Sequence, residues 1–298
     1  MNVCNFFQTS FMPIKGLLNL WSVLHPYRKR TVEMISRSLR VARWKAWMVF
    51  CSGLVSFVRH ANGYIQLTNL SIEKICDVAT QVRIDGESFL RAAIISDRPV
   101  LIVTMHMGDF QLGFLKLVEV CSPLKRQLSV FKMSAADERE RILLKAFGRF
   151  GAYPQVLRAN EEGGRQAFLA LRAGHVVAMT IDLEVSVKTR SVVNFLGHSC
   201  YMQNGPATIA LINRSLILPV INFTEKDGQR VVKVYPYIDT LNVFTSLPMV
   251  KRVDLLTQQL ANQLEIWIRT WPSQVQAWFA IADTLVEPLP RNRTQIKL

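Results

Sequence analysis

Short apolar runs alternate with amphipathic stretches from about residue 70 onward. Runs rich in Val, Ile and Leu and bounded by turn residues are typical of strands buried in a parallel sheet. We expect such strands at Val82–Ile84, Val100–Thr104, Leu128–Phe131, Val176–Ile181, Ile217–Phe223 and Val231–Tyr235. Apolar residues three or four positions apart are typical of helices instead. We expect helices at Ser71–Val82, Glu87–Ile95, Gln111–Val120, Ala135–Phe150, Gly163–Ala173, Gly205–Asn213 and Val253–Trp271.

This alternation favours an α/β fold with a mostly parallel central sheet flanked by helices. We expect one such domain over residues 71–285, with a helical N-terminal region over 1–70 and a polar tail over 286–298. The chain has 298 residues, which is enough to bury a large core. Half of its residues are hydrophobic, and this composition excludes a disordered or collagen-like chain.

The N-terminal region places basic residues between two apolar pieces, Phe11–Leu24 and Trp47–Val58. The basic residues are Arg28, Lys29, Arg30, Arg37, Arg40, Arg43 and Lys45. The second apolar piece has only twelve residues before Arg59 and is short for a membrane span. Large apolar residues recur there at helical spacing, namely Trp44, Trp47, Phe50, Leu54 and Phe57. Such a helix either packs on the domain or lies in a membrane interface, and the pattern leaves both interpretations open.

Charge and cysteine usage restrict the possible partners. Lys and Arg number 36 against 22 Asp and Glu, so the net charge is +14 and an anionic partner is expected. We expect no nucleic acid, because the chain has no zinc-finger spacing, no aromatic RNA-binding strip and no basic tail. Five scattered cysteines favour a reducing compartment, and no His/Cys cluster has metal-ligand spacing. No Gly-x-Ser-x-Gly elbow is present for a serine hydrolase.

The chemistry-bearing residues follow the buried strands, where open α/β sheets bind ligands. His106 comes directly after Val100–Thr104, with Gly108 next and a helix behind it. A nearby carboxylate can orient such an imidazole and stabilise it when it takes a proton. Asp109 is one candidate, although its position also suits the N-cap of the following helix.

Two further stretches have the same character. Asp182 and Glu184 alternate at the end of Val176–Ile181, so they point the same way, either into a site or into solvent. Asn204 and Gly205, followed by Pro206, are typical of a helix start whose backbone amides can receive an anion.

Four blocks in this order resemble the lipid A biosynthesis acyltransferase family, the bacterial lauroyl and myristoyl transferases of the lysophospholipid acyltransferase superfamily. The blocks are VRIDGESFLRAAIISDRPVLIVTMHMGDFQLG, TIDLE, VVNFLGHSCYMQNGPATIALINRSLILPV and LEIWIRTWPSQVQAW. They run from Val82 to Trp278, about two-thirds of the chain. The resemblance implies a glycerophosphate-acyltransferase-like fold with His106 as the catalytic histidine.

One position departs from the family pattern, which has Asp or Glu five residues after the histidine. Gln111 occupies that position and carries no charge to stabilise an imidazolium. Three interpretations are open. Asp109 takes over, Asp182 or Glu184 supplies the carboxylate from across the sheet, or the reaction has been lost or changed. We favour an active enzyme because His106 and the other blocks are intact.

The resemblance implies transfer of a fatty acyl group from a thioester to a hydroxyl or amine of a lipid or glycolipid, with no cofactor and no acyl-enzyme. The donor would be acyl carrier protein or acyl-coenzyme A, and the protein would work at the cytoplasmic face of the inner membrane, on its anionic surface. Basic residues that could hold phosphate oxygens are Arg149, Arg158, Arg165 and Arg190. The alternatives are a non-lipid-A acceptor, such as an aminoacyl lipid or a secondary metabolite, and a silent acyl-binding relative.

Overall fold

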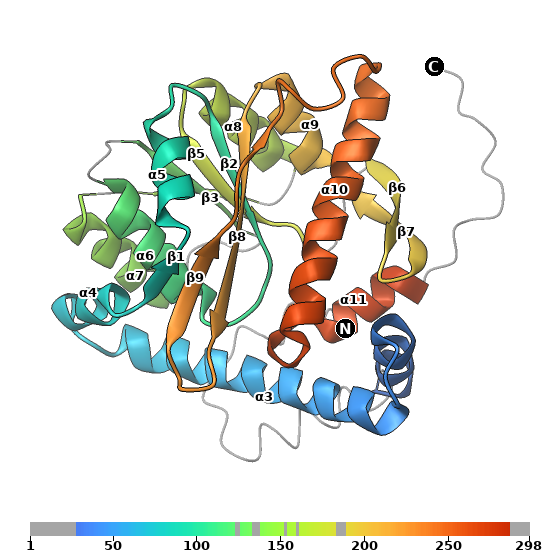
Figure 1. Cartoon of the computed structure of the whole chain (residues 1–298). Helices are drawn as coiled ribbons and strands as arrows, with labels where there is room; N and C mark the ends of the chain where they lie inside the picture. The colour runs from blue at the N-terminus through green and yellow to red at the C-terminus, as the bar shows by residue number, and fades with distance from the viewer. Residues whose placement is uncertain are drawn as a thin grey trace.

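In the computed structural model, residues 28–122, 126–132, 138–151, 154–158, 161–182 and 189–286 are described. Their helices flank a mostly parallel central sheet, which confirms the expected fold class (Figure 1). The strand order is β1-β9-β8-β2-β5-β3-β4, and β10 pairs with the start of β8. The strands are β1 (Arg83–Asp85), β2 (Val100–Thr104), β3 (Leu128–Lys132), β4 (Gln155–Arg158), β5 (Val176–Thr180), β8 (Leu216–Thr224), β9 (Arg230–Val234) and β10 (Ile238–Asp239).

The strands β8, β2, β5, β3 and β4 run parallel, whereas β9 runs antiparallel to β8. The six strands expected from the sequence are all present. The sequence analysis missed β4 and β10, because runs of four and two residues are too short to show a periodic pattern.

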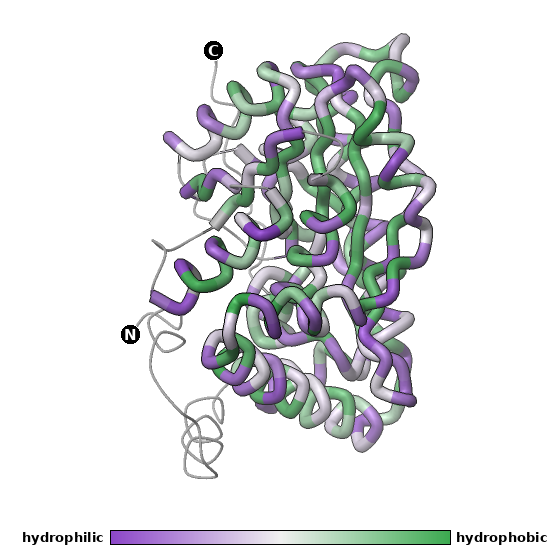
Figure 2. Tube along the Cα trace, turned by 90° about the vertical axis from the view of Figure 1, so that its left-hand side faces the viewer, coloured by the Kyte–Doolittle hydropathy of each residue, from purple (hydrophilic) through white to green (hydrophobic). Residues whose placement is uncertain are grey.

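Helices cover both faces of the sheet, and alternate residues of each strand pack on opposite sides. Val100 and Ile102 of β2 pack with one set of helices, and Leu101 and Val103 with the other. The first set is α4 (Ile72–Thr80), α5 (Glu87–Ile95), α6 (Phe110–Cys121) and α7 (Glu138–Arg149). The second set is α8 (Glu161–Arg172), α9 (Gly205–Ile212) and α10 (Met249–Thr270). Figure 2 shows hydrophobic colour along the strands and mixed colour on the helices around them.

A separate hairpin lies beside α10, formed by β6 (Arg190–Phe195) and β7 (His198–Gln203). Its turn residues Leu196 and Gly197 both have positive φ, as a tight two-residue hairpin requires. The short 3-10 helix η2 (Pro272–Gln274) and α11 (Trp278–Val286) follow α10. The sequence analysis did not predict the hairpin strands, because polar residues such as Asn194 and Gln203 interrupt their apolar pattern.

The N-terminal segment forms the helix Arg28–Leu39 and then the long helix α3 (Arg43–Thr68). In Figure 1, α3 crosses the edge of the sheet at which β8 ends and β9 begins. Gly53 of α3 packs against the η2 region so closely that an added Cβ would lie 2.7 Å from the Val275 carbonyl oxygen. Only glycine fits there, and α3 is therefore packed directly on the domain.

The two faces of α3 differ in their exposure to solvent. Phe50 and Val58 are buried, whereas Trp44, Met48 and Val55 are 62%, 58% and 51% exposed. Among the described helices, none is by itself long and apolar enough to cross a membrane. The helix Arg28–Leu39 and α3 would meet that test only as a pair, bent by 113°.

Candidate active site

The site lies where β2 and β5 end. These strands are parallel neighbours, with Thr104 opposite Thr180, and the Ile181 N–H donates to the Thr104 carbonyl oxygen at 3.0 Å. The pairing thus continues one residue past the end of β5. His106 and Asp182 each come two residues after a paired threonine, so the backbone brings them side by side.

His106 and Asp182 form a two-point contact. His106 Nδ1 lies 2.9 Å from Asp182 Oδ1, and the His106 backbone N–H donates to Asp182 Oδ2 at 2.9 Å. An ionised carboxylate only accepts hydrogen bonds, so the imidazole proton sits on Nδ1 and the Nε2 lone pair is left for a substrate. The Asp182 side chain is 1% exposed and that of His106 26% exposed, as suits a buried orienting acid and an accessible base.

The electrostatics of this pair favour proton uptake. Burial lowers the pKa of His106, but the charge and hydrogen bond of Asp182 outweigh it, so the pKa is raised above its usual value. The carboxylate therefore both fixes the imidazole tautomer and stabilises the imidazolium.

The loop that carries His106 is held by hydrogen bonds from Gln276, which lies in the segment after η2. The Gln276 side-chain amide donates to the Gly108 carbonyl oxygen at 2.7 Å. The Gln276 backbone N–H donates to the His106 carbonyl oxygen at 3.3 Å. Gly108 has φ +56°, and a Cβ there would lie 2.7 Å from the Asn222 carbonyl oxygen. The loop conformation therefore depends on glycine at this position.

Asp109 occupies the N-cap position of α6, but its side chain makes no capping hydrogen bond. Its carboxylate contacts the Arg230 guanidinium, and its Oδ1 lies 3.7 Å from His60 Nδ1. Burial raises the pKa of Asp109, but its contacts with His60 and Arg230 outweigh burial and lower the pKa overall. The structure thus places Asp182, and not Asp109, on His106.

Gln111, in the position where the family has an acid, makes no hydrogen bond to His106. Its Oε1 is buried and finds no hydrogen-bond donor in the part of the chain that the structure describes. Glu184 lies outside the described residues.

The four predicted anion-binding arginines are exposed but do not gather in one place. Arg158 ends β4, at the same edge of the sheet as His106. Arg149 ends α7, just before β4, and so lies at the opposite edge, where it faces Glu73. Arg165 pairs with Glu162 at 2.9 Å, and Arg190 begins β6.

Asn204 and Gly205 stand at the start of α9, as expected. Asn204 donates to Ser191 Oγ at 3.0 Å, and Ser191 donates to Asp254 of α10 at 2.6 Å. This chain of bonds ties the hairpin to α9 and α10. Within the described residues, the buried Asn204 Oδ1 has no hydrogen-bond partner.

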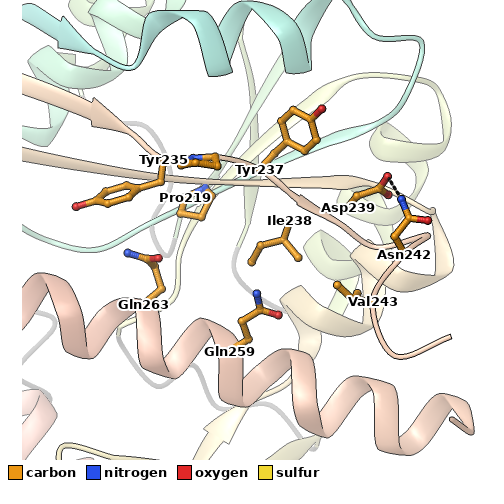
Figure 3. A pocket seen from close by; sticks show the side chains of 10 residues that line it. Pro219, Tyr235, Tyr237, Ile238, Asp239, Asn242, Val243, Gln259 and Gln263 are labelled. Atoms are coloured by element: carbon orange, nitrogen blue, oxygen red, sulfur yellow. Dashed lines mark hydrogen bonds between the residues drawn. The ribbon is translucent and has the colours of Figure 1, made fainter. Parts of the chain in front are cut away.

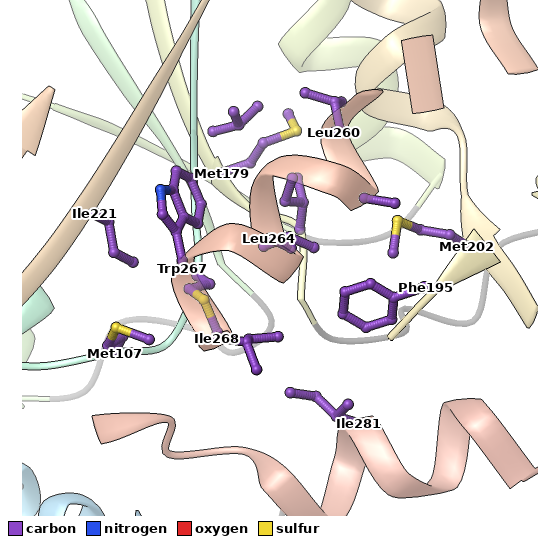
Figure 4. Close-up of a cluster of buried hydrophobic side chains, with 14 of the residues drawn as sticks. Met107, Met179, Phe195, Met202, Ile221, Leu260, Leu264, Trp267, Ile268 and Ile281 are labelled. Carbon is purple, nitrogen blue, oxygen red and sulfur yellow. The ribbon is translucent and has the colours of Figure 1, made fainter. Parts of the chain in front are cut away.

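Two pockets formed by described residues lie near the sheet. A small one of about 20 Å³ touches Asp182 and is lined mainly by apolar side chains, including Phe195, Met202 and Ile281. Figure 4 shows these side chains converging on Leu264 of α10. An open pocket of about 430 Å³ lies between α10 and Pro219, with Gln259 and Gln263 pointing toward it (Figure 3). None of the residues predicted for the site lines this second pocket.

The sequence analysis missed three residues around His106. Phe110 meets the His106 ring edge-on, His60 of α3 stacks on Phe110, and Gln276 holds the loop. His60 and Gln276 come from distant segments, and no local spacing signals their approach.

The geometry supplies a base oriented by a buried carboxylate. This arrangement suits proton removal from a hydroxyl or amine.

Comparison with known proteins agrees with such chemistry. No curated protein matches the chain. The sequence model of the family described as bacterial lipid A biosynthesis acyltransferase matches residues 56–281, which include every residue of the site described above. The chain therefore belongs to this family and is an acyltransferase of lipid biosynthesis.

Proposed function

We propose that the protein transfers a fatty acyl group from an acyl thioester to a hydroxyl or amine of a lipid or glycolipid acceptor, with His106 as general base. The contact between His106 and the buried Asp182 carries this proposal. The family implies an acyl donor and a lipid acceptor in general. An acyl carrier protein or coenzyme A thioester is the donor consistent with a strongly basic surface.

The reaction follows from the position of the proton on His106. Nε2 takes the proton of the acceptor group as its oxygen or nitrogen attacks the thioester carbonyl carbon. The carbon–sulfur bond then breaks, and the leaving thiolate receives the proton from the imidazolium. Asp182 remains ionised and stabilises the imidazolium in between.

The tetrahedral intermediate needs N–H donors for its oxyanion. The first N–H groups of α6 have no partner within the helix. Gln276 fixes the Gly108 carbonyl, so the Asp109 N–H on the other side of that trans peptide points away from Gln276. We assign this N–H as an oxyanion donor. The N-terminus of α9 at Asn204 and Gly205 is the alternative.

The small pocket beside Asp182 is where we place the acyl chain. Its lining is mainly apolar and includes Met202 and Leu264. Its volume of about 20 Å³ holds little more than one water molecule, so a chain enters only as the lining side chains move apart. Methionine is well suited to this, because its side chain is flexible.

We further propose that the protein binds the anionic surface of the inner membrane from the cytoplasmic side. Trp44, Met48 and Val55 form an exposed apolar stripe along α3. Lys45 and Arg59 flank this stripe, and both are exposed. An apolar stripe flanked by cations is the pattern of an interfacial helix.

A catalytically silent acyl-binding relative is the second candidate, and Gln111 favours it. The amide replaces the acid of the family motif, and its Oε1 is unpaired within the described residues. Against this stands the complete His106–Asp182 pair. An acceptor other than lipid A, such as an aminoacyl lipid, remains within the proposed chemistry.

Acyl transfer by the purified protein tests the proposal. The protein is incubated with acyl carrier protein or coenzyme A thioesters and a bacterial lipid extract, and acylated products are identified by mass spectrometry. We expect a product that is absent with His106→Ala. Turnover that appears only in Gln111→Glu would identify a silent relative. An equal product yield from His106→Ala would refute the assigned base.

A further inference from the structure

His60 is a second histidine beside the catalytic loop, and the proposed mechanism gives it no role. It lies in α3 and is buried. Its ring stacks on that of Phe110, with 4.6 Å between centroids and an interplanar angle of 24°. Phe110 in turn meets the His106 ring edge-on at 5.3 Å and 86°. Phe110 therefore contacts both imidazoles.

The ring of His60 also lies close to the N-cap residue of α6. Its Nδ1 lies 3.7 Å from Asp109 Oδ1, and the other oxygen of Asp109 binds Arg230 at the start of β9. Asp109 and Phe110 are adjacent, so His60 contacts both residues at the beginning of α6. The elements α3, α6 and β9 thus meet at this point, and α3 contributes the His60 ring that faces α6.

This arrangement matters because the base must be positioned closely. Asp182 fixes the Nδ1 edge of His106, which is the side away from the substrate. A second contact on the ring limits how far the imidazole can tilt about that hydrogen bond. Misplacement of a reacting group by about 1 Å can cost about 100-fold in rate.

We propose that His60 is a positioning residue for His106: its ring holds Phe110 against the catalytic imidazole. The activity readout rests on the proposed function, whereas the spectroscopic readout below does not. His60 acts through its aromatic face, so phenylalanine should replace it.

Kinetics of three variants separate the contribution of the His60 ring face from that of its ring nitrogens. We expect His60→Ala to lower kcat about tenfold with KM changed less than about twofold. His60→Phe preserves the stacking surface and should stay within about threefold of the wild type. His175→Ala, at the start of β5 and the opposite edge of the sheet, is the matched control. Equal losses in His60→Ala and His60→Phe would overturn the proposal, because the nitrogens would then matter instead.

Nuclear magnetic resonance of the full chain with labelled histidines gives a readout that needs no substrate. The chain has five histidines, and the His106 ring signals are assigned by their loss in His106→Ala. The Phe110 ring current should shift these signals, so His60→Ala and Phe110→Leu should move them in the same direction. His60→Phe and His175→Ala should leave them in place, and a well-dispersed spectrum confirms folding.

The two readouts distinguish the possible failures. The wild type could lack transferase activity while the His106 signals still move in His60→Ala and Phe110→Leu. That result would refute the proposed function and support the positioning role. Unmoved signals in both His60→Ala and Phe110→Leu would overturn the positioning role, whatever the activity.

Discussion

At the scale of single residues, His106 obtains its carboxylate from a strand end 76 positions away in the sequence. His106 could be singled out from the sequence because it follows a buried strand, and Asp182 could be named as one candidate partner. The choice among Asp109, Asp182 and Glu184 depends on which strand lies beside β2. Strand order is a tertiary property, and no local pattern records it.

The pH dependence of the reaction should report the His106–Asp182 pair. The neutral imidazole is the base, so kcat/KM should rise with pH and level off above the pKa of His106, which Asp182 raises above about 6.5. Asp182→Asn removes the raising charge. Its profile should therefore have a lower plateau and a midpoint at lower pH. A midpoint that stays in place or moves upward would contradict this assignment.

Gln276 should matter for both stability and rate. Gln276→Leu leaves the buried Gly108 carbonyl without its donor, at a cost of about 1–3 kcal/mol in the free energy of unfolding. It should also lower kcat, because the His106 loop loses the side-chain hydrogen bond at Gly108 and keeps only the backbone bond from Gln276. Gln274 is the matched control, since its amide bonds only to the Thr224 backbone, at 2.9 and 2.7 Å.

Urea denaturation and steady-state kinetics of both variants check this. Gln274→Leu should lose comparable stability and keep kcat near the wild-type value. Equal kcat values in the two variants would show that the Gln276 bonds do not position the loop.

At the scale of elements, the sequence predicted the buried strands and main helices well. The bounds of β2 and α5 agree with the expected ranges, and Ser71, which begins the helix expected at Ser71–Val82, caps α4 by accepting a hydrogen bond from the Lys74 N–H. The hairpin and β4 were missed because their residues are short runs or mixed in polarity. What holds the elements together was also not predictable, as Arg126 illustrates.

Arg126 ties together the amino ends of the central strands. Its guanidinium donates to the carbonyl oxygens of Ile94, Ser96, Arg98 and Gly174 at 2.9–3.1 Å. Arg126→Met should therefore lower the free energy of unfolding by about 3 kcal/mol, because several partly buried carbonyls lose a charged donor.

Thermal and urea unfolding measure this effect. Arg165→Met is the matched control, because Arg165 is exposed and pairs with Glu162 within its own helix. We expect little change there. A loss in Arg126→Met no larger than in Arg165→Met would contradict the role assigned to Arg126.

At the scale of the whole molecule, the chain has a net charge of +14 and α3 carries an exposed apolar stripe. The sequence left core packing and interfacial contact as alternatives for this helix. The structure shows that the inner face of this helix packs on the domain and that its outer face exposes Trp44, Met48 and Val55.

Vesicle binding tests the membrane contact proposed for that surface. The double variant Trp44→Ser/Met48→Ser should bind phosphatidylglycerol vesicles at least about tenfold more weakly, because two apolar side chains no longer enter the interface. Wild-type binding should also weaken as salt screens the basic residues. Ile95→Ser removes a side chain that is 67% exposed outside α3 and is the control. Vesicle sedimentation that gives the same affinity for both variants would contradict the assigned surface.

The most direct test of the account compares the rate of acyl transfer in Asp182→Asn with that in Asp109→Asn, on the same thioester and lipid acceptor. Asp182 contacts the catalytic imidazole, whereas Asp109 contacts Arg230 and His60. We predict that kcat/KM falls at least about 100-fold in Asp182→Asn and less than about tenfold in Asp109→Asn. The reverse order of losses would show that Asp109 is the carboxylate on which His106 depends.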